Sequence, residues 1–194
     1  MLIQFLLSMF NIPQKTYREP MVIRNILTDE ECEHIKSKAL PKLKMSTVSD
    51  DMIVDDAIRR SETAWLHTDD KVVHNVIHKC LRYTNKPCEN CEGIQVLRYK
   101  PRGFYSLHQD ASNSHRNKRA HTFILALNDE YEGGTTYFPV LNKHYKLNKG
   151  DALFFDTLDS HGMVNRKSLH TGEEVKCGEK WVCNIWVRQT KYRL

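Results

Sequence analysis

The first half of the chain has hydrophobic residues at the spacing of two amphipathic helices. The first follows a capping box formed by Thr28 and Glu31, and Pro41 ends it. Its apolar positions are Cys32, Ile35 and Ala39. The second is predicted over residues 70–83, and its apolar positions are Val73, Val76, Ile77, Cys80 and Leu81. Strands are predicted before the first helix, over residues 20–27, and between the two helices, over residues 60–66.

After Pro87 the pattern changes to short apolar runs of strand length, separated by turn residues such as Gly133-Gly134 and Gly150-Asp151. The runs cover residues 94–99, 104–110, 122–127, 135–138, 152–155 and 181–187. Two helices followed by many short strands predict a mainly β fold with flanking helices, a double-stranded β-helix (jelly-roll) barrel with the N-terminal helices packed on it.

No internal repeat or second domain is evident, so residues 1–194 are predicted to form a single domain. We divide it into an N-terminal arm (1–20), a helical support region (21–87) and the jelly roll (88–194). Residues 46–57 are polar and acidic, which is typical of an exposed loop, and we keep this loop as a candidate lid over a substrate.

Composition narrows the class of protein. With 40% hydrophobic and 27% charged residues, the chain is predicted to be globular, and no apolar run reaches the length of a bilayer span. Residues 1–10 are apolar but lack the basic start and cleavage pattern of a signal peptide, so we expect an arm packed on the domain, with a truncated membrane anchor as the alternative. With no retention tetrapeptide at residues 191–194, a cytoplasmic enzyme is expected.

The formal charge of +5 indicates a solvated basic surface and could favour acidic substrates. No aromatic and basic residues alternate as in a nucleic-acid platform, so neither a nucleic acid nor a membrane is predicted as a partner. The oligomeric state is left open.

Six cysteines are compatible with three disulfides, but Cys32 and Cys80 fall on helix faces where reduced core thiols are common. Cys88 and Cys91 form a single C-x-x-C pair, which is insufficient for a zinc site. We expect thiols in a reducing compartment. A local disulfide, or a secreted domain that would lose its fold under reductant, is the alternative. On the second helix His74 and His78 lie four apart, and they are predicted to face solvent.

The most informative short motif is the His108-Gln109-Asp110 triplet. Both residues fall on the strand predicted over residues 104–110, so their side chains are expected to point to the same face, because side chains two apart on a strand do so. An imidazole and a carboxylate are two of the three ligands of the facial triad that binds non-haem Fe(II). A polar strand edge is the alternative interpretation.

A third ligand is sought among the later histidines, His121, His144, His161 and His170. Only His170 is followed ten residues later by a lysine, Lys180. A 2-oxo acid bound at iron needs its far carboxylate neutralised inside the barrel, and a buried lysine can do this. We therefore favour His170 over His161, which we interpret as a loop histidine.

From about residue 21 onward the chain resembles the prolyl 4-hydroxylase family of Fe(II)/2-oxoglutarate dioxygenases, the procollagen-proline 4-dioxygenase type, and in particular its compact microbial and viral members. The resemblance rests on five motifs in the family order: Tyr105 to Asp110, Arg119-Ala120-His121-Thr122, Gly133-Gly134-Thr135-Thr136-Tyr137-Phe138-Pro139, Ser168-Leu169-His170 and Gly178-Glu179-Lys180-Trp181.

The resemblance implies roles for ten residues. The iron ligands would be His108, Asp110 and His170. Lys180 would pair with the distal carboxylate of 2-oxoglutarate, and Tyr99 and Thr136 would hydrogen-bond this cosubstrate. Substrate proline would be held by Tyr105, Arg119 and Trp186, although both aromatic side chains are equally compatible with core packing. Arg188 stands where some members have a substrate-contacting histidine.

The expected reaction couples oxidative decarboxylation of 2-oxoglutarate, with O2 as the second cosubstrate and ascorbate as reductant, to 4-hydroxylation of proline in a peptide or protein. Glu173-Glu174 in place of the family's Cys-Pro pair, Ala126 in place of a tyrosine, and the short 110–119 segment affect substrate choice rather than chemistry. The alternatives are a dioxygenase of the same fold acting on another residue or a small molecule, and a non-catalytic binding module.

Overall fold

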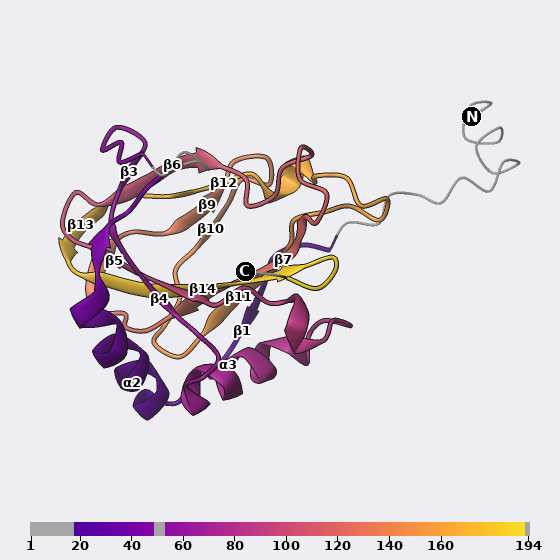
Figure 1. The fold of residues 1–194 in the computed structure, drawn as a ribbon. Coiled ribbons are helices and arrows are strands. Elements are labelled where there is room, and N and C mark those ends of the chain that lie inside the picture. The colour runs from indigo at the N-terminus through magenta and orange to yellow at the C-terminus, as the bar shows by residue number, and fades with distance from the viewer. Residues whose placement is uncertain (1–17, 49–52, 193–194) are drawn as a thin grey trace, which may run out of the picture.

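The computed structural model describes residues 18–48 and 53–192. Most of the predicted arm, and residues 49–52 of the predicted lid, lie outside this range. The described chain forms two antiparallel layers of strands, and two helices cover one face of the larger layer (Figure 1). This arrangement confirms the predicted mainly β jelly roll with flanking helices.

Both predicted helices are present. Helix α2 (Asp29–Ala39) begins at the predicted capping box, in which the Thr28 hydroxyl accepts from the Glu31 amide at 3.2 Å and the Glu31 carboxylate accepts from the Thr28 amide at 2.9 Å. Helix α3 (Lys71–Leu81) is shorter than predicted, because Asp70 caps its N-terminus by accepting from two amides. Neither these nor any other helix in the described ranges is long and apolar enough to cross a membrane.

The larger sheet has seven strands. In spatial order they are β1 (Met21–Ile23), β11 (Ala152–Asp156), β7 (Arg119–Ala126), β14 (Lys180–Arg188), β5 (Ile94–Tyr99), β4 (Glu62–Leu66) and β2 (Lys44–Met45). The smaller sheet has five: β10 (Lys143–Tyr145), β9 (Thr136–Phe138), β12 (His170–Gly172), β6 (Phe104–His108) and β3 (Arg59–Arg60). Strands β8 (Tyr131–Gly133) and β13 (Val175–Gly178) form a separate pair. Short 3-10 turns are η1 (Leu40–Lys42), η2 (Cys88–Asn90) and η3 (Arg166–Ser168).

Most predicted strands have different bounds in the structure, and one of them is divided in two. The strand predicted over residues 60–66 is two strands that join different sheets, with a break at Ser61. At this break the buried Ser61 hydroxyl bonds to the Ser46 hydroxyl at 2.7 Å and to Arg59 Nε at 3.0 Å. The strand predicted over residues 104–110 ends at His108. The short strands β2, β8, β10, β12 and β13 were not predicted, because runs of two to four residues carry little periodicity.

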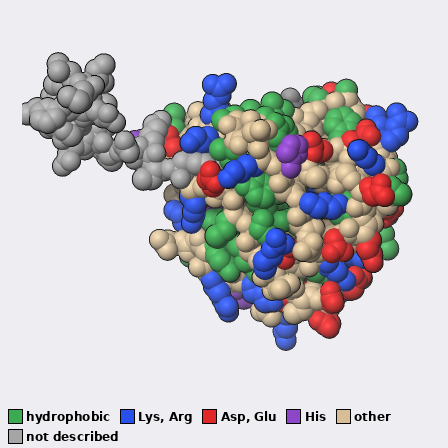
Figure 2. Space-filling model, turned by 180° about the vertical axis from the view of Figure 1, so that it is seen from behind, with side chains coloured by type: hydrophobic (Ala, Val, Ile, Leu, Met, Phe, Trp, Pro, Cys, Tyr) green, Lys and Arg blue, Asp and Glu red, His purple; other side chains and the backbone are tan. Residues whose placement is uncertain are grey.

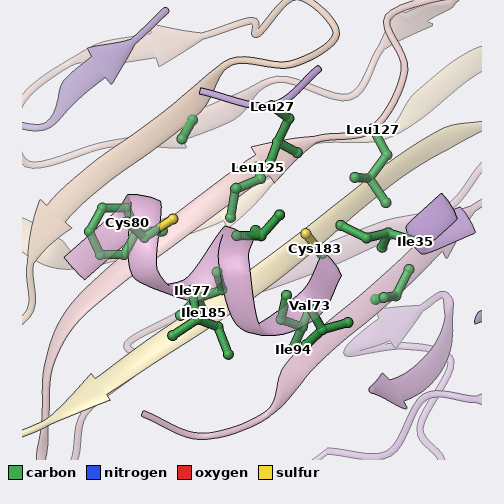
Figure 3. Packing of buried hydrophobic residues seen from close by; sticks show 14 of the residues in the cluster. Leu27, Ile35, Val73, Ile77, Cys80, Ile94, Leu125, Leu127, Cys183 and Ile185 are labelled. Carbon is green, nitrogen blue, oxygen red and sulfur yellow. The ribbon is translucent and has the colours of Figure 1, made fainter. Parts of the chain in front are cut away.

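Side chains alternate between two cores along the central strands. On β14, Cys183 and Ile185 join the core beneath the helices, whereas Val182 faces the core between the sheets. Strand β7 does the same with Phe123 and Ile124. Figure 3 shows the first core, where the inward side of α3 packs on the sheet. The second face of the same strands is therefore free to carry a site inside the barrel.

Candidate active site

Strand pairing brings the two predicted metal-binding histidines together. His108 ends β6 and His170 begins β12, and the two are register partners, so their ring centroids lie 4.3 Å apart. Asp110 follows β6, and its carboxylate joins them, with the ligand atoms of all three residues within 4.8 Å of one another. The expected geometry of one straight strand is wrong for Asp110, because β6 stops two residues earlier.

Hydrogen bonds fix the orientation of each of the three side chains. Nδ1 of His108 bonds to the Ser106 carbonyl at 2.7 Å, and Nδ1 of His170 bonds to the Ser168 carbonyl at 2.8 Å. Because a carbonyl only accepts, each Nδ1 carries the hydrogen and each Nε2 keeps its lone pair. On Asp110, Oδ2 accepts from the Thr122 hydroxyl at 2.7 Å, which leaves Oδ1 for a metal. Oδ1 lies 3.8 Å from His108 Nε2.

The electrostatics favour the protonation states that bind a metal. Burial, together with the neighbouring His170, lowers the pKa of His108, so the imidazole is neutral. Burial alone would raise the pKa of Asp110, but the charged Arg119 guanidinium and the hydrogen bond from the Thr122 hydroxyl are among the contributions that lower it, so the carboxylate is ionised. The neutral His108 imidazole, the His170 imidazole and the ionised Asp110 carboxylate form a ligand set that suits Fe(II) in a facial arrangement.

A narrow pocket of about 30 Å³ lies beside the triad, and its lining includes Tyr99, Thr136, His170 and Lys180. Lys180 begins β14 opposite Tyr99, and its ammonium donates to the Gly134 carbonyl at 2.7 Å. Burial, with a smaller effect of Lys146, lowers the pKa of Lys180 to about 8. A buried cation whose neighbour is one backbone carbonyl is a strong site for an anionic group.

The double-glycine motif makes room for this lysine. Gly134 has φ +62°, and a Cβ placed there would lie 3.0 Å from Val175 Cγ2 and 3.2 Å from Lys180 Cδ. Any larger residue would therefore be strained and would press on the lysine side chain.

A larger cavity of about 620 Å³ opens on the other side of His108 and Asp110. Tyr105 lines both cavities, stacks on the His108 ring at 3.7 Å and also packs against the core between the sheets, so both interpretations of this side chain hold in part. The larger cavity is also lined by Arg119, Trp186 and Arg188. All four residues that were predicted to contact substrate therefore lie on its wall.

The buried acid Glu92 holds both predicted substrate arginines, and the sequence analysis missed it. Its carboxylate accepts from Arg119 at 2.6 and 2.8 Å, and from Arg188 Nε at 2.9 Å. Burial would lower the pKa of Arg119, but the bonds to Glu92 raise it. Glu92 is placed by its amide, which donates to the Trp186 carbonyl. Glu92 belongs to no sequence motif. It reaches Arg119 and Arg188 because its backbone is docked against β14 at Trp186.

Trp186 presents an unpaired donor in this region. Its ring lies against the Arg119 guanidinium at 3.5 Å and the Trp65 ring at 5.9 Å. Its Nε1 is buried and has no hydrogen-bond partner among the residues that the structure describes. A buried unpaired donor costs about 1–3 kcal/mol, which a bound acceptor would recover.

The remaining sequence candidates lie elsewhere. His161 sits on an exposed turn and is outside the triad cluster. The larger cavity is lined by Thr47 of the predicted lid and by Lys44 and Met45, which precede the lid. Closure by residues 46–57 stays a prediction. On the molecular face seen in Figure 2, basic and acidic side chains are interspersed.

Comparison with known proteins adds an independent line of observation. The family model described as the 2OG-Fe(II) oxygenase superfamily matches residues 94–188. A prolyl 4-hydroxylase homologue of Acanthamoeba polyphaga mimivirus is 33% identical over 91% of this chain and 76% of its own length. Prolyl 4-hydroxylase 1 of Arabidopsis thaliana is 34% identical over 87% of this chain and 68% of its own. The crystal structure of the viral collagen prolyl hydroxylase of Paramecium Bursaria Chlorella virus-1, in its 2OG complex, superposes with a TM-score of 0.73 at 28% identity, covering 89% of this chain and 97% of that one.

Proposed function

The chain belongs to the prolyl 4-hydroxylase family of 2OG-Fe(II) oxygenases, and from this premise we propose that it hydroxylates proline in a peptide or protein. In this proposal His108, Asp110 and His170 hold the iron. The observation that carries it is the convergence of two Nε2 lone pairs and one free carboxylate oxygen within 4.8 Å. When bound, Fe(II), 2-oxoglutarate and O2 supply the oxidation, which yields a hydroxylated substrate, succinate and CO2.

Lys180 is proposed to bind the far carboxylate of 2-oxoglutarate. Its ammonium is buried in the pocket next to His170, and a carboxylate would give it the counter-charge that Gly134 cannot. Tyr99 and Thr136 line the same pocket and are proposed to donate hydrogen bonds to the cosubstrate. Since the lysine side chain now folds back onto Gly134, we expect it to turn when the cosubstrate enters.

The larger cavity is proposed to hold the proline-containing segment. An extended proline-rich chain is already close to its bound conformation, so it pays little entropy on entering an aromatic groove. Trp186 supplies an apolar surface and a buried Nε1 donor for a peptide carbonyl, while His108 and Asp110 line the same space beside Tyr105. Arg119 is proposed to position the Trp186 ring and the substrate together.

A dioxygenase acting on another residue or on a small molecule is the alternative function. The size of the open cavity, about 620 Å³, and its continuation to Lys44 and Trp65 favour an extended substrate. Ascorbate is proposed as the reductant. The names of the relatives refer to prolyl hydroxylation, and they support proline as the target.

Succinate release from 2-oxoglutarate, with Fe(II) and ascorbate, tests the proposal in the presence and absence of a proline-rich peptide. We expect peptide-stimulated release by the wild type and by His161→Ala, whose imidazole is exposed on a turn, and none by His170→Ala. Release by wild type that no proline peptide stimulates would discard proline as the target. Release that survives His170→Ala would refute the ligand set.

A further inference from the structure

A second group of metal-binding side chains lies on the helical side of the molecule. His74 and His78 are one turn apart on α3, both exposed, and Cys88 begins η2 just after the helix. The ligand atoms of these three residues lie within 4.8 Å of one another. The sequence alone indicated a solvent-facing pair of histidines, and that pair is exposed. The fold adds the thiol, which lies ten residues beyond the second histidine.

The distance between the two imidazole nitrogens matches that found around a bound transition metal. The two Nε2 atoms are 3.2 Å apart, and the rings are tilted by 46° with centroids 4.3 Å apart. Two imidazoles bound to one Zn²⁺ at about 2.05 Å with tetrahedral angles have their nitrogens about 3.3 Å apart. A hydrogen bond between the two imidazoles would also give this distance, but that arrangement does not involve Cys88.

Both supports of the cluster are rigidly placed. The opposite side of α3 carries Val73, Ile77 and Cys80 into the core, which fixes the rotation of the helix (Figure 3). The η2 turn is held by Asn90, whose side-chain amide donates to the carbonyls of Arg188 and Gln189 at 3.0 and 3.1 Å. Ligands on fixed elements need little reorganisation to bind an ion.

We propose that His74, His78 and Cys88 form a second metal site, for a zinc-type divalent transition metal. Two imidazole nitrogens and one sulfur, with no carboxylate in the group, select such an ion over Mg²⁺ or Ca²⁺. Binding forms a metal–sulfur bond and releases the thiol proton to solvent, without any redox change. The fourth position faces solvent, because both histidines are exposed.

The ion would tie α3 to the segment that leads into Glu92. Glu92 lies four residues after Cys88 and holds Arg119 and Arg188 in the larger cavity. The second site therefore has a structural role, stabilising the connection on which the groove arginines depend. It is independent of the proposed iron ligands and of the proposed substrate.

Cobalt titration of metal-free full-length protein tests the site. Co²⁺ bound to a thiolate gives a sulfur-to-metal charge-transfer band in the near ultraviolet, and the triad His108, Asp110 and His170 contains no sulfur, so the band does not come from the triad. We expect the band in the wild type and in His170→Ala, and its displacement by Zn²⁺. Cys88→Ser should abolish the band, whereas the control Cys177→Ser, at an exposed free thiol, should keep it.

The histidines are tested separately. His74→Ala and His78→Ala should each weaken Co²⁺ and Zn²⁺ binding on the order of 100-fold. Zn²⁺ should raise the Tm of His170→Ala protein but not that of the same protein carrying Cys88→Ser. The proposal is overturned if no charge-transfer band forms. It is also overturned if the band needs Cys91 but neither histidine, since the ligands would then be the C-x-x-C pair.

Discussion

The substitution Glu92→Gln tests whether the two groove arginines depend on one buried carboxylate. Only 3% of the Glu92 side chain is exposed, and the Arg119 and Arg188 side chains are 23% and 18% exposed. Removing one partner of a buried ion pair costs about 3–5 kcal/mol, and the glutamine amide retains part of the hydrogen bonding, so we expect a loss of about 2–4 kcal/mol. For a chain of this size that corresponds to a Tm lower by roughly 5–15 °C.

Thermal unfolding with Glu89→Gln as the matched control gives the measurement. Glu89 pairs with Lys191 at 3.3 Å on the surface, and its loss should change stability by no more than about 0.5 kcal/mol. Glu92→Gln should also raise the KM for the peptide about tenfold, because Arg119 loses its position over Trp186, while the KM for 2-oxoglutarate stays near that of the wild type. Equal Tm values for the two variants would refute the reasoning.

Three further predictions concern the proposed iron ligands, the proposed cosubstrate pocket and the groove. Thr122→Val removes the hydroxyl that orients Asp110, and should weaken Fe(II) binding about 10–100-fold in an iron titration. Thr122→Ser keeps a hydroxyl and should retain the wild-type affinity. Unchanged affinity in the valine variant would contradict the orienting role of Thr122. Lys180→Met should raise the KM for 2-oxoglutarate on the order of 100-fold. In the wild type, binding of 2-oxoglutarate should weaken as pH rises through about 8, because the ammonium then loses its proton, and a flat pH profile would count against this assignment. Since Lys44 and Lys118 line the groove, proline peptides with flanking acidic residues should have a lower KM than peptides with flanking lysines. The difference should shrink as ionic strength rises to about 0.15 M. Equal KM values at low salt would refute the charge argument.

The pKa of Lys180 also has a consequence for stability. In the unfolded chain its pKa is 10.5, and in the folded protein burial lowers it to about 8. Between these two values the unfolded state binds more protons than the folded state, so stability rises with pH in this window, by up to roughly 3 kcal/mol. Urea unfolding at pH 8 and pH 10 measures the slope, and Lys180→Met should flatten it.

Local periodicity predicted the elements of the fold well, because the long ones bury one face. The spacing of Cys32, Ile35 and Ala39 predicted α2, and the apolar run over residues 94–99 gave β5 with its observed bounds. Several elements of two to four residues were missed, β12 among them, even though it carries His170, whereas β1 and β9, which are as short, were predicted. A strand this short is specified by its neighbours β6 and β9, and that information is absent from its own three residues.

Sequence motifs identified most residues of the candidate site. Residues that reach the site only through strand pairing could not be identified in this way. All ten predicted residues line one of the two cavities beside the triad, and their assigned roles stay predictions until tested. Glu92 and the Cys88 contact to His74 and His78 carry no motif. They depend on how the connection between α3 and β5 is docked against the end of β14.

Strand β14 explains why so much of this site depends on one register. Its residues on one face, Lys180, Trp186 and Arg188 among them, line the two cavities, and those on the other face, such as Cys183 and Ile185, pack beneath the helices. Moving the strand by one residue would bury the lysine and the arginine under α3 and expose the apolar side chains to the barrel. The core therefore influences the chemistry, since the burial that stabilises one face of β14 determines which side chains of the other face line the two cavities.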